Sequence, residues 1–292
     1  MGLLSGLSGL GLGKMEEVNI IEDKKNEKKS DEPVVEKTPE QLEKEAVFER
    51  VLTCPVCDLE FKTQSIRPGK AKLAGSDSDL RPRYEKIDPI KYDAIACNNC
   101  GYAGLTKYFP SLSSRQLKAV KEQIVPNFKG FDTHPGIYSY DDAIMRYKLA
   151  LVTSVVKQAK NSERAYTALK LAWVLRGKRE GLEQKNGSPR EIDTLKSDEL
   201  EALQVAYDGF TIALSKETAP IANMDENTVM YLLAELAHRL KKYDEASRLC
   251  GLVLTNKSTQ PRLKERAYDL KEILKEEIKR AKEAAQSASA DA

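Results

Sequence analysis

Four cysteines in two closely spaced pairs are the residues whose types and spacing best suit chemistry. The pairs are Cys54-Pro-Val-Cys57 and Cys97-Asn-Asn-Cys100-Gly101. Two residues between the cysteines of a pair let both sulfurs reach one ion from a tight turn, and two such turns supply the four thiolates of a closed tetrahedral site. We therefore expect these four cysteines to bind one structural Zn²⁺.

Other chemistries remain open for the same cysteines. A single tetrahedral iron, as in rubredoxin-like electron carriers, is one alternative, because the chain from Cys100 to Phe109 resembles the second rubredoxin turn. Asp58 stands where the first turn of such proteins has glycine. A pair of separate dithiols, or disulfides, is another alternative. A catalytic zinc is not expected, because four cysteines leave no coordination position open.

The chain around the cysteines has the composition of a small β-rich module. Short runs of β-branched and aromatic residues alternate with turn formers such as Arg67-Pro-Gly69 and Asp88-Pro89. The interval between the cysteine pairs is longer than in the shortest two-pair zinc signatures, so residues 62–90 are expected to be an insertion. A unit of this size buries little apolar surface and needs a metal or a disulfide. We expect a zinc-ribbon-like module at 46–112.

Beyond this module the apolar residues recur with helical spacing. They predict a loop at 182–196 and helices at 114–124, 139–160, 162–181, 197–217, 226–241, 243–256 and 261–285. The residues at positions where side chains cap helix N-termini are Ser139, Ser162, Ser197 and Asp225. The expected fold class is α+β, mostly α.

Three of the predicted helices carry residues at the spacing of tetratricopeptide (TPR) repeats. Ala143-x-x-x-Tyr147-x-x-Ala150 and Ala206-x-x-x-Phe210-x-x-Ala213 fit the pattern, and Ala246-x-x-x-Cys250-x-x-Val253 fits it loosely. Small residues let helices approach closely, and the aromatic ring fills the gap between them. We expect a TPR-like helical array at 113–285, with Cys250 and Trp173 in its core. A generic helical bundle is the alternative.

The two ends of the chain differ from the modules between them. Residues 1–45 combine a Gly/Leu-rich start with a charged linker, and residues 286–292 form a short tail. Both are expected to be disordered. The alternative for residues 1–13 is a segment that docks on a partner or a membrane surface.

Composition and the remaining motifs exclude several classes of function. The 47 basic residues nearly balance the 45 acidic ones, so no excess of positive charge recruits nucleic acid or an anionic membrane. No stretch approaches the roughly 20 apolar residues of a membrane span, and no signal peptide is evident, which favours a cytoplasmic location. His134 and His238 lack nearby catalytic partners, and no phosphate-binding or metalloprotease motif occurs. We therefore expect no enzyme.

Basic residues also occur in the interval between the cysteine pairs. Loop 67–84 could present them on one surface, with Tyr84 available for stacking on bases. The residues concerned are Arg67, Lys70, Lys72, Arg81 and Arg83. Ordinary solvated loop residues explain the same pattern, so nucleic acid binding is the weaker hypothesis.

The order of these motifs resembles a known bacterial family. The run Ser76-Asp-Ser-Asp-Leu80-Arg-Pro-Arg-Tyr84, followed by Cys97-Asn-Asn-Cys100-Gly-Tyr-Ala103, is similar to that of the domain-of-unknown-function family 2225. The resemblance covers roughly Val51 to Ala285. It implies a bacterial origin and a cysteine module followed by TPR-like helices. Because the family's activity is not established, the resemblance implies an architecture and a set of four metal ligands but no reaction.

Together these patterns favour a non-enzymatic, zinc-binding scaffold. Its helical array, at 139–285, is expected to bind a protein or peptide partner in a concave groove. The alternatives are a nucleic-acid-associated zinc-ribbon regulator and a redox protein with an iron centre or a dithiol. The segment Asp79-Leu-Arg-Pro82 is expected either to be functional or to be a loop that closes over the cysteine module.

Overall fold

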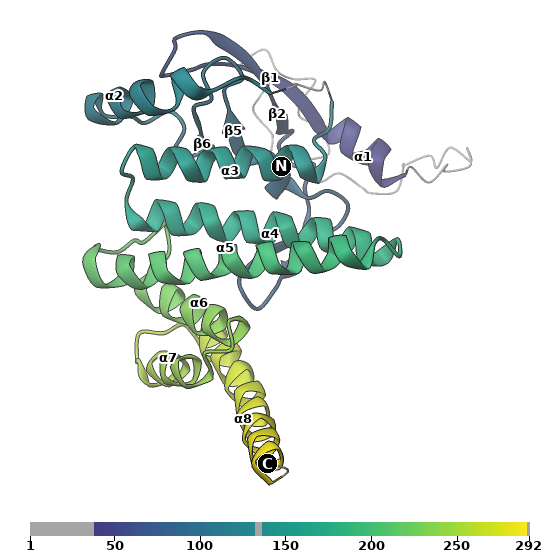
Figure 1. The fold of residues 1–292 in the computed structure, drawn as a ribbon, viewed down its shortest axis with the longest axis vertical. Helices are drawn as coiled ribbons and strands as arrows, with labels where there is room; N and C mark the ends of the chain where they lie inside the picture. The colour runs from purple at the N-terminus through teal and green to yellow at the C-terminus, as the bar shows by residue number, and fades with distance from the viewer. Residues whose placement is uncertain (1–37, 132–135, 291–292) are drawn as a thin grey trace, which may run out of the picture. The chain divides into compact units, whose positions relative to one another are not determined.

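A computed structural model describes residues 38–131 and 136–290 of the chain. The expectations for residues 1–37, for His134 and for the last two residues therefore lie outside the described residues. The described chain is mostly helical, with three antiparallel pairs of short strands (Figure 1). The predicted fold class, α+β and mostly α, is confirmed at this level.

Two β-hairpins carry the cysteine pairs in their turns. The strands of these hairpins are β1 (Val47–Thr53) with β2 (Glu60–Ile66), and β5 (Ala94–Ala96) with β6 (Ala103–Leu105). Both pairs are antiparallel, and Thr53 lies opposite Glu60 at the first turn. Cys54 directly follows β1 and Cys97 directly follows β5, so the end of each strand fixes one cysteine pair.

A third hairpin fills the interval between the cysteine pairs. It consists of β3 (Leu73–Ser76) and β4 (Pro82–Tyr84), with a register shift between Leu73 and Gly75. The chain reverses between the two strands through Leu80, whose φ of 66° is left-handed. The predicted insertion at 62–90 is therefore shorter than expected at its start, because residues 62–66 belong to β2.

Eight α-helices lie within the described ranges. They are α1 (Pro39–Ala46), α2 (Ser114–Gln123), α3 (Tyr140–Val156), α4 (Asn161–Gln184), α5 (Pro189–Lys216), α6 (Glu226–Arg239), α7 (Tyr243–Thr255) and α8 (Pro261–Ala290). Each of the seven predicted helices corresponds to one of α2 to α8. None of these helices is both long enough and apolar enough to cross a membrane.

Three segments expected to lack regular structure are helical at least in part. Residues 39–46 form α1, which Thr38 and Gln41 cap reciprocally and which Pro39 begins at a position where proline fits a helix. α5 begins at Pro189 for the same reason, so much of the predicted loop at 182–196 is helix. At the other end of the chain, α8 continues to Ala290, into the expected tail.

The predicted N-caps are correct for two helices and wrong for two. Ser139 caps α3 and Asp225 caps α6, each accepting a hydrogen bond from a backbone N–H of the first turn. Ser197 lies inside α5, because that helix begins earlier. Ser162 lies inside α4, where its backbone N–H donates to the Glu217 carboxylate 3.1 Å away. The end of α5 thus supplies the acceptor for the start of α4.

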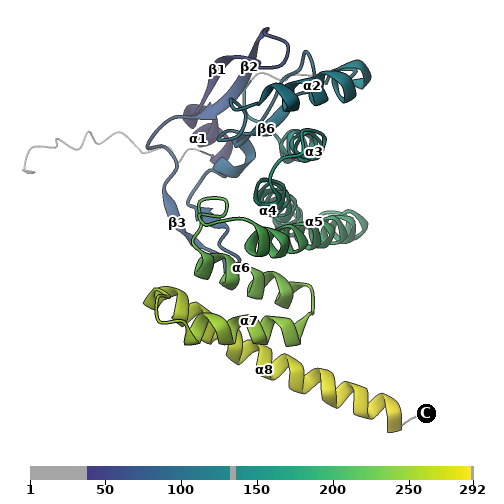
Figure 2. The same ribbon diagram turned by 90° about the vertical axis from the view of Figure 1, so that its left-hand side faces the viewer.

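Small and aromatic residues at the predicted repeat positions line the contacts between helices. Ala143, Tyr147, Ala206 and Phe210 are fully buried, as is Cys250. Helices α4 and α5 approach closely at Gly209, where an added Cβ would lie 2.8 Å from the Ala165 Cβ. Figure 2 shows α3, α4 and α5 as successive layers, followed by α6 and α7.

Part of the cysteine module packs into the main hydrophobic core of the helices. Ile90, Ala94 and Leu105, from the β module, cluster with the buried residues of α3 and α4. Tyr147 of α3 donates its hydroxyl proton to the Ile90 carbonyl oxygen 2.8 Å away, and the Ala103 N–H of β6 donates to the α3 residue Thr153. Helix α3 therefore positions the hairpin that holds the second cysteine pair.

Candidate metal centre

The hairpin turns bring all four predicted ligand residues together. The sulfur atoms of Cys54, Cys57, Cys97 and Cys100 all lie within 4.8 Å of one another. The Sγ atoms of Cys54 and Cys100 are 3.6 Å apart, and those of Cys57 and Cys97 are 3.8 Å apart. Four sulfurs that each lie about 2.3 Å from a central ion are separated by about 3.8 Å in a tetrahedron. The cluster could therefore hold a metal ion without rearrangement.

The two turns are built in the same way. The Cys54 N–H donates to the Leu59 carbonyl oxygen at 3.0 Å, and the Cys97 N–H donates to the Tyr102 carbonyl oxygen at 2.8 Å. The residue after the second cysteine of each pair has a positive φ, 59° at Asp58 and 78° at Gly101. Asp58 thus adopts the conformation for which glycine is typical, and the two turns form equivalent halves of one site.

Glycine at position 101 also meets a steric requirement. A Cβ added there would lie 2.6 Å from the Phe128 ring, which packs directly against the turn. Any amino acid other than glycine at this position would meet both the strain of the left-handed backbone and a clash with the Phe128 ring. The glycine that follows Cys100 therefore lets the Phe128 ring pack against the second cysteine turn.

The cluster is sealed by an apolar core of its own. Cys54 and Cys97 are fully buried and Cys100 is 2% exposed, whereas Cys57 is half-buried. The buried apolar residues around them include Val56, Phe61, Tyr102, Phe109 and Val120, the last from α2. A site with four sulfur donors and little access for water suits a structural metal better than a catalytic one.

Hydrogen bonds among the thiols separate their pKa values. The Cys100 thiol faces both Cys54 and Cys97, and these hydrogen bonds raise its pKa. The pKa of Cys97 is lowered because Cys100 and Cys54 stabilise its thiolate. Four adjacent thiols cannot all ionise without a compensating cation. A divalent metal would replace their protons, and four sulfur donors are the ligand set that Zn²⁺ and iron accept.

The insertion between the cysteine pairs contacts the helices rather than the cysteine turns. Asp79 is completely buried. Its carboxylate accepts hydrogen bonds from the Trp173 ring nitrogen at 3.1 Å and from the Arg176 guanidinium at 2.6 Å. Burial alone would raise the pKa of Asp79, but Arg176 lowers it below its ordinary value. The segment Asp79-Leu-Arg-Pro82 thus anchors the hairpin to α4 and does not close over the cysteine module.

Two cations of the candidate nucleic-acid loop form ion pairs within the molecule. The Arg81 side chain is 4% exposed and lies 3.4 Å from the Asp88 carboxylate and 3.3 Å from the Glu180 carboxylate. Arg83 lies 2.6 Å from Glu180 and 2.7 Å from Asp77. Tyr84 is half-buried. Only the flanking cations of the loop, Arg67, Lys70 and Lys72, remain exposed.

Sequence reasoning missed the buried partners of this hairpin. Arg176 bonds both Asp79 and Glu199, and Glu235 of α6 accepts a hydrogen bond from Ser78 at 2.5 Å. The available signal was the position of these charged residues on the apolar faces of their helices. Two residues outside the cysteine cluster have structural surroundings that explain them. His238 contacts the Glu277 carboxylate at 3.0 Å, and burial raises the pKa of Cys250 to about 11.

Comparison with known proteins places the chain in a family. No curated protein and no solved structure matches the chain. Residues 47–274, which include both cysteine pairs and the helices from α2 to the first half of α8, match the family model described as "Uncharacterized protein conserved in bacteria (DUF2225)". The match spans most of the sequence, and the chain therefore belongs to this bacterial family.

Proposed function

We propose that the chain is a non-enzymatic scaffold of the bacterial cytoplasm, in which one structural Zn²⁺ organises a zinc-ribbon-like module and a TPR-like helical array binds a protein or peptide partner. The four-sulfur cluster carries this proposal, because its donors and their spacing fit a tetrahedral ion. A reducing cytoplasm keeps such thiols available for metal. Roughly 10–16 kcal/mol of apparent zinc-binding free energy would stabilise the short hairpins.

The helical packing supports the second half of the proposal. Buried Ala–aromatic–Ala sets on α3 and α5 resemble the packing residues of TPR helices. Val205 and Ile212 of α5 are 42% and 40% exposed. Because seven residues make about two helical turns, both side chains lie on the same solvent-facing side of α5. This apolar strip is a candidate contact surface for a partner.

Elemental analysis tests the metal. We expect one zinc per chain in the full-length protein, with the metal lost from a Cys97→Ser variant. Cys250→Ser is the matched control, because this cysteine is buried away from the cluster and its variant keeps the metal. One iron per chain would replace the structural role with an electron-transfer role. No metal together with rapid alkylation of all four cysteines would favour a dithiol.

Affinity capture tests the scaffold. The full-length protein is expected to retain a discrete bacterial protein. A Val205→Asp/Ile212→Asp variant with unchanged metal content is expected to recover at least tenfold less of that protein. Substitution of Glu201, which is also exposed on α5, by Lys serves as a control for surface charge. Equal recovery by all three proteins would remove α5 from the binding surface. Binding of DNA or RNA that weakens steeply with salt would support the nucleic-acid alternative instead.

A further inference from the structure

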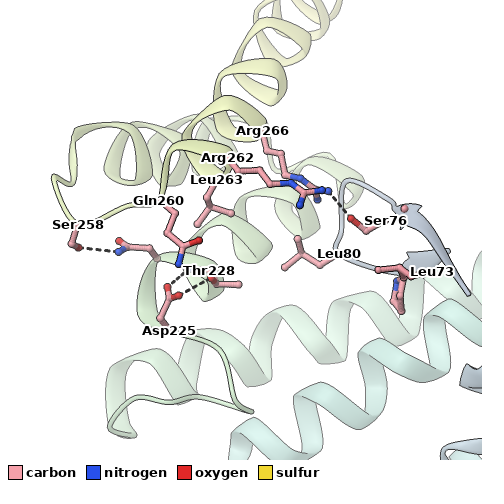
Figure 3. Close-up of a pocket in the computed structure, with 13 residues that line it drawn as sticks. Leu73, Ser76, Leu80, Asp225, Thr228, Ser258, Gln260, Arg262, Leu263 and Arg266 are labelled. Atoms are coloured by element: carbon pink, nitrogen blue, oxygen red, sulfur yellow. Dashed lines mark hydrogen bonds between the residues drawn. The ribbon is translucent and has the colours of Figure 1, made fainter. Parts of the chain in front are cut away.

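A pocket of about 600 Å³ lies between the β3–β4 hairpin and the first turns of α6 and α8 (Figure 3). Pockets that bind small molecules have volumes of about 300–1,000 Å³ and combine apolar walls with a few polar groups. The described residues that line this pocket include none of the four cysteines and no residue of α5. A ligand bound here would therefore touch neither the metal cluster nor the apolar strip of α5.

One side of the pocket is apolar and remains in contact with solvent. It is formed by Leu73 of β3, Leu80 of the hairpin turn and Leu263 of α8. Leu73 is 65% exposed, and the other two leucines are half-buried. Removal of such apolar surface from water favours the binding of an apolar group against it.

The hairpin side of the pocket is fixed before any ligand binds. The Leu80 backbone has a φ of 66°, a left-handed conformation that is rare for a bulky residue. Neighbouring contacts hold it there, because the Asp79 carboxylate accepts hydrogen bonds from Trp173 and Arg176. Strained conformations of this kind persist only where the surrounding structure determines them, and they cluster at binding sites. A preformed wall also lowers the ordering cost of binding.

The charges around the pocket favour an anionic ligand. Its charged lining residues are Asp225 and, from α8, Arg262 and Arg266, which leaves a net positive charge. Arg266 donates to the Asp77 carbonyl oxygen and to the Ser76 hydroxyl, and Asp225 caps α6. The Arg262 guanidinium has no hydrogen bond or ion pair with another residue of 38–131 or 136–290. It is therefore available to an anion.

We propose that this pocket binds a small amphipathic anion, an unbranched apolar chain that ends in one carboxylate. The chain lies against Leu73, Leu80 and Leu263, and the carboxylate pairs with Arg262. A guanidinium can bind a carboxylate through two parallel N–H···O hydrogen bonds. Because the charged lining residues sum to a single positive charge, a singly charged head group matches the pocket. The site is separate from the metal and goes beyond the scaffold function.

Calorimetric titration of the full-length protein with hexanoate, octanoate and decanoate tests the pocket. We expect one binding site per chain, with each added methylene tightening the binding about threefold to fourfold. Octanol is the matched ligand without a charge. It is expected to bind at least about tenfold more weakly than octanoate, because it cannot form a charge-assisted hydrogen bond with the guanidinium.

Two substitutions separate the two halves of the site. Arg262→Gln is expected to weaken octanoate binding at least about tenfold and to leave octanol binding unchanged. Leu73→Ser is expected to weaken both ligands by the same factor, because it removes apolar surface only. Lys264→Gln is the matched control, because it removes the same charge from the same turn of α8 outside the lining of the pocket. It leaves both affinities unchanged.

The variants are compared at equal metal content and equal melting temperature, so a loss of binding is not a loss of fold. No heat of binding with decanoate at about 1 mM would overturn the proposal. Equal losses in Arg262→Gln and Lys264→Gln would also overturn it, since they would show only the net charge of the protein. Octanol that binds as tightly as octanoate would remove the anion from the proposal, and more than one decanoate per chain would indicate unspecific adsorption.

Discussion

The residue that follows each cysteine pair has a left-handed backbone, but the two positions differ in the space around them. The φ angle is 59° at Asp58 and 78° at Gly101. A side chain in this conformation costs about 1–2 kcal/mol for most residues, and less for aspartate, whose side chain can bond locally. The second turn has the additional contact with Phe128. The two halves of the metal site therefore differ in how much change they tolerate.

Gly101→Ala is expected to destabilise the cysteine module by more than the backbone strain of about 1–2 kcal/mol, because the added Cβ would also displace the Phe128 ring. The measurements are the zinc dissociation constant by chelator competition and the free energy of unfolding in denaturant. Asp58→Gly, at the equivalent position, should keep the metal and be neutral or more stable. A cost of Gly101→Ala no larger than the backbone strain of about 1–2 kcal/mol would show that the contact with Phe128 does not matter for the site.

The sequence predicted the cysteine cluster and missed the buried charges for one physical reason. A metal-ligand pair is local, so residue type and a spacing of three positions identify it. Asp79 and Arg176 are 97 positions apart, and each alone has the character of a solvated charge. Only the tertiary arrangement makes them a pair. The same reason applies to Glu180, which pairs with Arg81 and Arg83 from 99 and 97 positions away.

The contact between α4 and α5 depends on the absence of a side chain at Gly209. Helix propensity alone makes Gly→Ala favourable by about 1 kcal/mol. At Gly209 the new Cβ would lie 2.8 Å from that of Ala165, and overpacking of a core costs about 1–3 kcal/mol. We expect Gly209→Ala to lower the free energy of unfolding by up to about 2 kcal/mol net.

Gly251, in α7, is the matched position without a neighbour. No heavy atom lies within 4 Å of a Cβ added there, so Gly251→Ala should raise the free energy of unfolding by about 1 kcal/mol. Denaturant unfolding of both variants measures the difference. Two stabilising substitutions would mean that α4 and α5 can move apart without cost.

The contact between α6 and α8 includes a titratable histidine. Glu235 and Glu277 raise the pKa of His238 above its ordinary value of 6.5. Because the folded protein holds the proton more tightly than the unfolded chain, this stabilisation is complete below pH 6.5. It is lost as the pH rises through the folded pKa.

We therefore expect the free energy of unfolding of the wild type, relative to a His238→Gln variant, to fall between pH 6 and pH 9. Denaturant unfolding at several pH values in that interval measures this difference. The charged neighbours on both helices, Glu235, Arg239 and Glu277, stay unchanged in the variant. A constant difference across the interval would contradict the assignment to His238.

Helix boundaries were predictable where the capping residue lies next to the helix in the sequence. Ser139 and Asp225 cap the helices that follow them, and the sequence shows this directly. Gly187-Ser188-Pro189 has the composition of a loop, but a proline in the first turn also begins a helix. Glu217, which bonds the start of α4, lies 55 positions from Ser162, and no local pattern shows such a cap.

At the scale of the whole molecule, the shared core couples the metal to the helices. The second cysteine hairpin packs on α3 and the insertion packs on α4, so unfolding of the cysteine module would expose apolar surface on both helices. We expect removal of zinc by a chelator to lower the melting temperature of the helices by roughly 10 °C or more. Circular dichroism follows the helices, and fluorescence of Trp173, the single tryptophan, follows the insertion.

Both signals are expected to shift together and to recover when zinc is restored. The Cys97→Ser variant should melt at the lowered temperature with or without added metal. A helical transition that stays in place while the fluorescence change moves would show that the two modules unfold independently, despite the core that they share.

The order of the chain has a consequence for synthesis on the ribosome. Asp79 leaves the ribosome 97 residues before Arg176, and Ser78 precedes its partner Glu235 by 157 residues. For most of that interval both cysteine pairs are already present. Asp79 still lacks its partner Arg176, and the insertion has no helix on which to pack. A nascent chain can therefore assemble its metal site early, while the hairpin that the site encloses stays solvated until α4 and then α6 emerge.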